Sequence, residues 1–293
     1  MHLRNPIEWV AGQFAAPART VGCAPPEVYW PLSQKTAIPE IQSITMEDLK
    51  AALRLGLNDF VACRTDVIFL CVIYPVIGLF IAGAEAQGGL LHLVFPTVAG
   101  FALVGPFFAL GLFEMSRQRE LTGKIRWLDT FNVLRSPSIG SIALMGLVLV
   151  GLFLTWLAVA HGIYRMTLGG TTPESVGAFM RDVFATQAGW AMIALGWAAG
   201  ALFAAVVLAI SVVSFPLMLD RPTTLRTAMA VSSRAMRRNP GYLGCWGVLV
   251  GSALFVAALP CFVGLIVVLP VFGHATWHLY RRVVKPPMVE ERV

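Results

Sequence analysis

The sequence predicts an all-α fold, a polytopic membrane bundle of six transmembrane helices arranged as three hairpins with cytoplasmic amphipathic helices. Three observations support this prediction. Hydrophobic residues make up 57% of the 293 residues and charged residues 13%, against the ~25% usual in soluble domains. Mean hydropathy is +0.73. Residues 242–280 hold no Asp, Glu, Lys or Arg, and this run is too long for one span of about 20 residues but suits two.

The chain is divided by composition into a tail and a membrane domain. Residues 1–44 are predicted to be an irregular cytoplasmic tail, because six prolines interrupt any long element. The membrane domain is expected to occupy 45–285, and 286–293 to form a second cytoplasmic tail. The N-terminal region shows no apolar run of the kind that marks a signal peptide, so the first span is expected to act as the insertion signal.

An amphipathic helix is predicted to begin at Thr45. Thr45 and Asp48 have the spacing of a capping box, and apolar residues then recur at helical intervals as far as Phe60. Asp59 lies off this apolar stripe. We expect the helix to lie on the membrane surface or beneath the bundle.

Six uncharged stretches are predicted to cross the membrane. They are about 67–83, 89–113, 139–160, 190–219, 242–258 and 261–280. The second contains Pro96 and the pair Gly105-Pro106, and the fourth contains Pro216, so both are expected to bend. Pro260 is expected to lie in the turn between the last two spans.

The connections between spans differ in character. Residues 114–126 are predicted to form a charged loop, followed by a short amphipathic turn at 127–134. Thr172 as N-cap, with Pro173 and Glu174 after it, predicts the start of an interfacial helix on the far side. Residues 222–238 are predicted to form another amphipathic helix.

The distribution of basic residues predicts the orientation. Twenty of the 22 Lys and Arg residues lie in the two terminal segments and in the connections after the second and fourth spans. The remaining connections hold only Arg165 and Arg181. Cytoplasmic segments carry the excess of Lys and Arg, so both termini are expected in the cytoplasm.

Three segments resemble a bacterial family of six-helix membrane proteins, domain of unknown function 2189. They are GPFFALGLFE (105–114), SFPLMLD (214–220) and GHATWHLYRR (273–282), of which the last is the most specific. The resemblance extends over about 45–285. It implies a multi-pass, six-helix fold in a bacterial inner membrane and no established activity, although some members are labelled as cytochrome c oxidase subunits.

His274 and His278 are the weak candidates for cofactor binding. Their spacing places both rings on one face of a helix, which suits a metal or one edge of a haem site. His92 and His161 are expected near the opposite face of the membrane, so no third histidine is expected at the same depth. Alternatively, the pair forms an interfacial belt with Trp277 and Tyr280, and no cofactor or metal is firmly predicted.

Two further sets of residues are candidates for contact with lipid or with other helices. The lipid-facing candidates are Arg226, Arg234, Arg237, Arg238, Trp277 and Tyr280. The arginines are expected to attract anionic lipid at the cytoplasmic face, and they also fit the basic character of a cytoplasmic connection. A ladder of small residues, Gly196, Gly200 and Ala204, is expected to pack inside the bundle or at a dimer interface.

The function predicted from these observations is that of a non-catalytic accessory, assembly or scaffold subunit of a membrane complex. No GxSxG, HExxH, Walker A or GxGxxG motif occurs, and no charged residue lies within a predicted span. The expected partners are membrane lipids, including anionic lipid, and other membrane subunits or a second copy, with no nucleic acid. A small-solute transporter or channel and a haem- or metal-binding respiratory component remain as alternatives.

Overall fold

Helices form the regular structure of the chain, as the sequence predicts. The computed structural model describes residues 39–285 apart from 88, 125 and 170–174, so most of the predicted tails lies outside the described residues. The helices are α2 (Met46–Cys71), α3 (Ile73–Gln87), α4 (Leu91–Phe108), α5 (Leu110–Thr122), the 3-10 helix η2 (Trp127–Arg135), α6 (Ile139–Thr167), α7 (Val176–Ala185), α8 (Gln187–Ser211), α9 (Ser214–Asp220), α10 (Leu225–Arg238), α11 (Pro240–Ala258) and α12 (Leu265–Val283). The all-α class is confirmed.

Four stretches of the described residues are long and apolar enough to cross a membrane. They are Leu91–Thr122, Ile139–Thr167, Gln187–Asp220 and Pro240–Ala258, and they overlap the second to fifth predicted spans. The first predicted span, 67–83, corresponds to the end of α2 and to α3, whose apolar part, Pro75–Glu85, is shorter. The sixth, 261–280, corresponds to α12, whose second half is rich in His, Trp, Tyr and Arg. The six-span topology is therefore not confirmed.

The second and fourth predicted spans are divided, as their prolines indicate. The boundary between α4 and α5 is Ala109, three residues after Pro106. The boundary between α8 and α9 lies at residues 212–213, just before Pro216. Proline lacks an amide hydrogen and therefore cannot donate to the carbonyl four residues earlier, which here belongs to Val212.

Part of the predicted charged loop is helical. α5 continues through the charged residues to Thr122, so a loop is wrong for 114–122. The helix ends at Gly123, whose φ of +70° is left-handed and whose amide donates to the carbonyl of Arg119 at 2.8 Å. Glycine adopts this conformation without a Cβ clash, so Gly123 rather than the charges marks the end of the helix.

The helix starts agree with capping chemistry in two places. The capping box at α2 is confirmed, because the Thr45 amide donates to Asp48 Oδ2 at 2.9 Å and the Asp48 amide donates to Thr45 Oγ1 at 3.4 Å. At α7 the N-cap is Ser175, whose hydroxyl accepts from the Ala178 amide at 3.1 Å. Thr172, the predicted N-cap, lies outside the described residues.

Residues just before α2 pack against the end of α12. Ile41 pairs with Val284, and the Gln42 amide donates to the Val283 carbonyl at 2.8 Å. Ile41 and Ile44 are 5% and 3% exposed. Ordered packing therefore begins within residues 39–44, which the sequence assigns to the tail.

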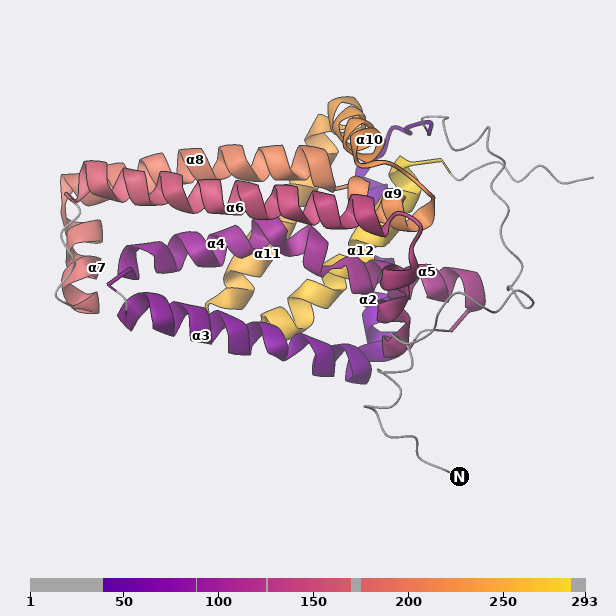
Figure 1. Cartoon of the computed structure of the whole chain (residues 1–293), viewed down its shortest axis with the longest axis horizontal. Helices are drawn as coiled ribbons and strands as arrows, with labels where there is room; N and C mark the ends of the chain where they lie inside the picture. Colours follow the sequence, from indigo (N-terminus) through magenta and orange to yellow (C-terminus); the bar gives the residue numbers. More distant parts are fainter. Residues whose placement is uncertain (1–38, 88, 125, 170–174, 286–293) are drawn as a thin grey trace, which may run out of the picture. The chain divides into compact units, whose positions relative to one another are not determined.

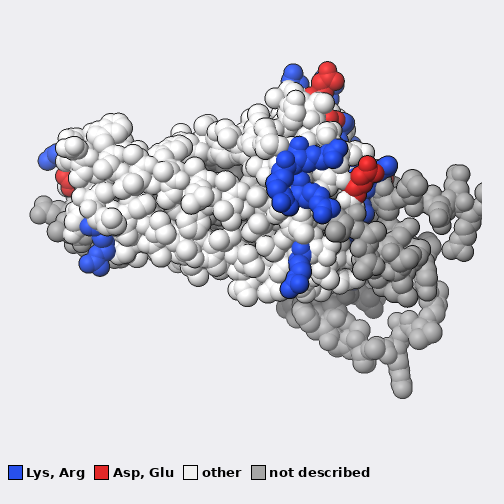
Figure 2. Space-filling model, turned by 90° about the horizontal axis from the view of Figure 1, so that it is seen from above, with Lys and Arg blue, Asp and Glu red and all other residues white. Residues whose placement is uncertain are grey.

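The long helices are arranged side by side. α6 packs against both α4 and α8, while α7 lies across one end of this group (Figure 1). α12 packs chiefly along α2 and much less along α11, its predicted hairpin partner. In Figure 2 the surface over the long helices is almost without charged residues, which gather toward its two ends. This arrangement packs α12 against both α2 and α5.

A candidate functional site in a buried polar cluster

Close helix packing positions the candidate site. A Cβ added to Gly56 of α2 would overlap the backbone of Ala275 of α12. A Cβ added to Gly273 of α12 would overlap the side chain of Leu112 of α5. Two glycines thus bring α2 and α5 against the same turn of α12, which carries His274.

Asp59 is the centre of this site. Asp59 is 4% exposed, and its carboxylate accepts three hydrogen bonds. Arg119 Nη1 donates to Oδ1 at 2.6 Å, while Ser116 Oγ and His278 Nε2 donate to Oδ2 at 2.6 and 2.9 Å. We call Asp59, Ser116, Arg119, His274 and His278 the polar cluster. It joins α2, α5 and α12.

His274 is the most deeply buried member of the polar cluster, with an exposure of 0%. Its Nδ1 lies 2.8 Å from Ser116 Oγ. The single hydroxyl proton of Ser116 is donated to Asp59, so Ser116 accepts from His274 and the proton of His274 lies on Nδ1. The unprotonated Nε2 then faces Cys63 Sγ at 4.0 Å.

The charge of Asp59 is stabilised by its neighbours. Burial by itself raises the pKa of the Asp59 carboxyl, but hydrogen bonds from His278 and Ser116 lower it more, so the pKa lies below its ordinary value. Asp59 is therefore ionised at neutral pH. A carboxylate with three donors is well satisfied in a buried position.

Four further polar side chains in the second half of α12 bond to other helices. Trp277 Nε1 donates to Glu120 Oε2 at 3.1 Å, and Tyr280 Oη donates to Asp220 Oδ2 at 2.6 Å. Arg281 pairs with Glu120 at 2.6 Å, and Arg282 with Asp48 at 2.7 Å. The last turns of α12 thus connect α2, α5 and α9 through polar contacts.

The histidine pair does not converge on a common point. His274 and His278 share a face of α12, as their spacing predicts, but His274 bonds to Ser116 and His278 to Asp59. Among the described residues, no group of three or more His, Cys, Asp or Glu side chains is arranged to hold a metal ion. The chemistry that the arrangement does support is a chain of hydrogen bonds from the partly exposed His278 to the buried His274.

Trp277 and Tyr280 differ from their predicted lipid-facing position. Both are buried, at 0% and 1% exposure. The physical reason is that each ring finds a carboxylate partner within the protein, so its polar atom does not need the headgroup region.

The predicted arginine face of α10 is exposed. Arg226, Arg234, Arg237 and Arg238 all lie on the surface, and Figure 2 shows a group of basic side chains over this part of the molecule. Salt bridges to these four side chains are absent among the described residues, although Arg238 Nε donates to Ser43 Oγ at 3.1 Å.

The predicted ladder of small residues packs at one position only. Gly200 of α8 lies against Trp156 of α6, with 3.3 Å between an added Cβ and the ring. Gly196 faces open space, and Ala204 is exposed. The ladder therefore does not form a continuous interface inside the bundle.

A second polar contact lies in the half of the bundle near α7. His92 Nε2 is 2.9 Å from His161 Nδ1, and the His92 ring stacks on Tyr164 with a centroid distance of 4.0 Å. The sequence places both histidines near the face opposite His274, but nothing in their spacing predicts that they touch.

Sequence reasoning missed three members of the polar cluster. Asp59 carries a signal, because it lies off the apolar stripe of its helix. Ser116 and Arg119 carry none, since the sequence predicts a loop at these positions. Only the helical continuation of α5 brings these two residues within hydrogen-bonding distance of Asp59 in α2, and Ser116 within reach of His274 in α12.

Comparison with known proteins identifies a family over part of the chain. Residues 94–220 match the family described as "Predicted integral membrane protein (DUF2189)". The resemblance to DUF2189 is thus confirmed over α5 to α9 and most of α4. Ser116, Arg119 and Asp220 lie within the DUF2189 match, whereas Asp59 and segment 273–282 lie outside it. Neither the curated proteins nor the solved structures give a match.

Proposed function

We propose that the chain is a non-catalytic accessory, assembly or scaffold subunit of a membrane complex in a bacterial inner membrane. One observation carries this proposal, a stripe of small residues on the outward face of α8. Ala194, Ala198, Ala201 and Ala205 are all exposed, and their spacing of three and four places them along one side of the helix. Small residues let two helices approach closely in lipid, where packing drives association.

Large aromatic residues lie next to this alanine stripe. Trp190 and Trp197 are 58% and 65% exposed, and their spacing of seven places them beside the stripe. A shallow alanine surface bordered by two rings has a shape that accommodates a partner helix. Because the stripe lies within the DUF2189 match, we take the partner to be another membrane subunit or a second copy of this chain.

The polar cluster supports a structural role. Its carboxylate, hydroxyl, imidazole and guanidinium groups bond to one another across three helices. Such a network holds α2, α5 and α12 in one arrangement and stabilises the charged end of the protein. This end would support the helices that contact the partner.

The proposal includes six spans with both termini in the cytoplasm. α3 and α12 would add the first and sixth crossings to the four stretches described above. The excess of Lys and Arg in the segments that include α2, α5, α10 and the end of α12 supports this orientation.

Purification from native membranes in a mild detergent tests the proposal. The wild-type chain should bring a membrane protein, or a second copy, in a fixed ratio. Ala198→Phe should lose this companion, because the ring holds the partner helix away. Ala158→Phe is the matched control, since Ala158 is exposed on α6 and should have no effect. A chain that purifies alone and shows a substrate-dependent activity would contradict the proposal.

A further inference from the structure

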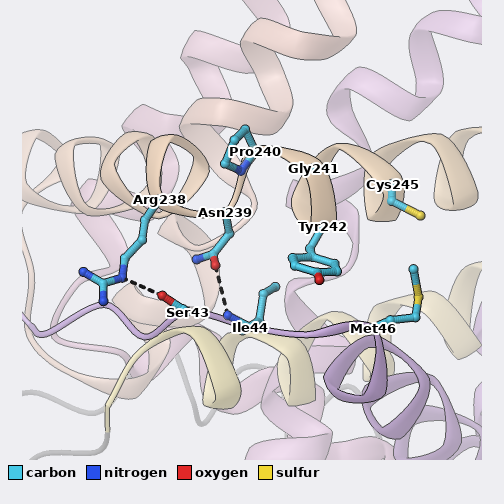
Figure 3. A pocket seen from close by; sticks show the side chains of 9 residues that line it. All are labelled: Ser43, Ile44, Met46, Arg238, Asn239, Pro240, Gly241, Tyr242 and Cys245. Atoms are coloured by element: carbon cyan, nitrogen blue, oxygen red, sulfur yellow. Dashed lines mark hydrogen bonds between the residues drawn. The ribbon is translucent and has the colours of Figure 1, made fainter.

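A cavity lies beside the arginine face of α10, at the point where α11 begins. Its volume is about 350 Å³, and its walls come from α10, α11 and the residues that lead into α2. Figure 3 shows Arg238 near one end of this cavity and Met46 and Cys245 near the other. The cavity thus has a cationic end and an apolar end.

The cationic end belongs to a larger basic surface. Arg226, Arg234, Arg237 and Arg238 are exposed and lie within about a third of the circumference of α10. Arg238 uses its Nε for Ser43, which leaves the two terminal nitrogens of the guanidinium for a ligand. This surface attracts anions, and a phosphate accepts several such donors at once.

The first turn of α11 also lines the cavity. Asn239, the N-cap of α11, uses its side chain to bond the Ile44 amide at 3.0 Å and the Gln42 carbonyl at 2.9 Å, so it does not cap the helix. Gly241 and Tyr242 line the cavity and precede Leu243, whose amide makes a helical bond to Asn239. The amides of Gly241 and Tyr242 come before this first helical bond. Amides in the first turn of a helix lack a helical partner and favour a negative charge.

The apolar end continues along an exposed face of α11. Tyr242, Cys245, Leu249 and Val256 are all exposed and are spaced by three, four and seven residues, so they share one face. α11 is one of the four stretches able to cross a membrane. An acyl chain could follow this face into the bilayer from a headgroup held near Arg238.

We propose that this cavity binds the headgroup of an anionic phospholipid, with an acyl chain along α11. The proposal deepens the proposed function by naming a lipid partner, and it rests on the membrane location of α11. It does not depend on a protein companion, so lipid binding and loss of a companion subunit are separate outcomes.

Native mass spectrometry of the full-length protein in detergent tests the site, with dioleoyl phosphatidylglycerol and dioleoyl phosphatidylcholine as probes. The wild type should retain phosphatidylglycerol in preference to phosphatidylcholine. Arg238→Gln should weaken phosphatidylglycerol binding about fivefold. Arg54→Gln is the matched control, because Arg54 is exposed on α2 outside the cavity and should have little effect.

Two further variants keep the test decisive. Cys245→Trp fills the apolar end and should abolish the preference for phosphatidylglycerol while all arginines remain. Arg237→Gln replaces Arg238→Gln if the latter does not fold, since Arg237 has no described protein partner whose loss could unfold the chain. Equal retention of both lipids, equal effects of Arg54→Gln and the α10 variants, or unchanged binding in Cys245→Trp would each overturn the proposal.

Discussion

Asp59 shows how a single charged residue can be accommodated inside a helical membrane protein. A buried carboxylate without partners is costly, but Asp59 accepts from Arg119, Ser116 and His278. The same bonds fix the proton of His274 on Nδ1. The orientation of two histidines and a serine therefore depends on the negative charge of one residue.

Replacing Asp59 should destabilise the protein. Asp59→Asn removes the charge that three donors face. Leaving buried hydrogen-bonding groups unsatisfied should lower the free energy of unfolding by about 1–3 kcal/mol. The apparent melting temperature in detergent should fall by several degrees. Glu47→Gln on the same helix is the control, because Glu47 is exposed and its melting temperature should stay at the wild-type value.

The pH dependence of stability should carry the signature of Asp59. Its pKa is lower in the folded protein than the ordinary value of 3.8, so its contribution is fully present above that value and is lost as the pH falls through the folded pKa. The melting-temperature difference between wild type and Asp59→Asn should therefore shrink below about pH 4. A difference that grows on acidification would show that the folded pKa is not lowered.

At the scale of helices, the packing of α2 on α12 is the main contact that the sequence does not predict. The hydrophobic runs predict α12 as the partner of α11 in a hairpin, but its polar second half bonds to α2, α5 and α9. Gly56 permits the close approach, because a side chain there would overlap Ala275.

A methyl group at Gly56 tests this contact. In an open helical position Gly→Ala gains about 0.5–1 kcal/mol, since glycine loses more backbone freedom on folding. Gly151→Ala on α6, where an added Cβ meets nothing within 4 Å, should therefore raise the melting temperature slightly. Gly56→Ala should lower it. If both variants were stabilised, α2 and α12 would not approach as closely as the structure has them.

The sequence predicts local features of this fold better than contacts between distant parts of the chain. Periodicity, proline and capping patterns are local, and they predict the apolar helices, the division before Pro216 and the start at Thr45. Contacts such as Asp59 with His278 join residues far apart in sequence, and no local pattern encodes them. Gly123 does carry a local signal for the end of α5, although its charged surroundings suggest a loop.

At the scale of the whole molecule, the six-span topology can be tested with the exposed cysteines. Cys261 lies in the turn after α11, which the proposal places on the far side of the membrane. In a chain with Cys261 alone, a membrane-impermeant maleimide should label intact cells after removal of the outer barrier. A chain whose single cysteine is Lys285→Cys should be labelled only after the inner membrane is opened. The reverse pattern would contradict the proposed orientation.

Crosslinking in native membranes tests the proposed subunit role most directly. A photoreactive residue placed at position 198, in the alanine stripe of α8, should yield a discrete adduct with a membrane protein or a second copy. The same residue at position 147, where Leu147 of α6 is 66% exposed, is the control and should yield none. No adduct at position 198, or equal adducts at both positions, would contradict the account.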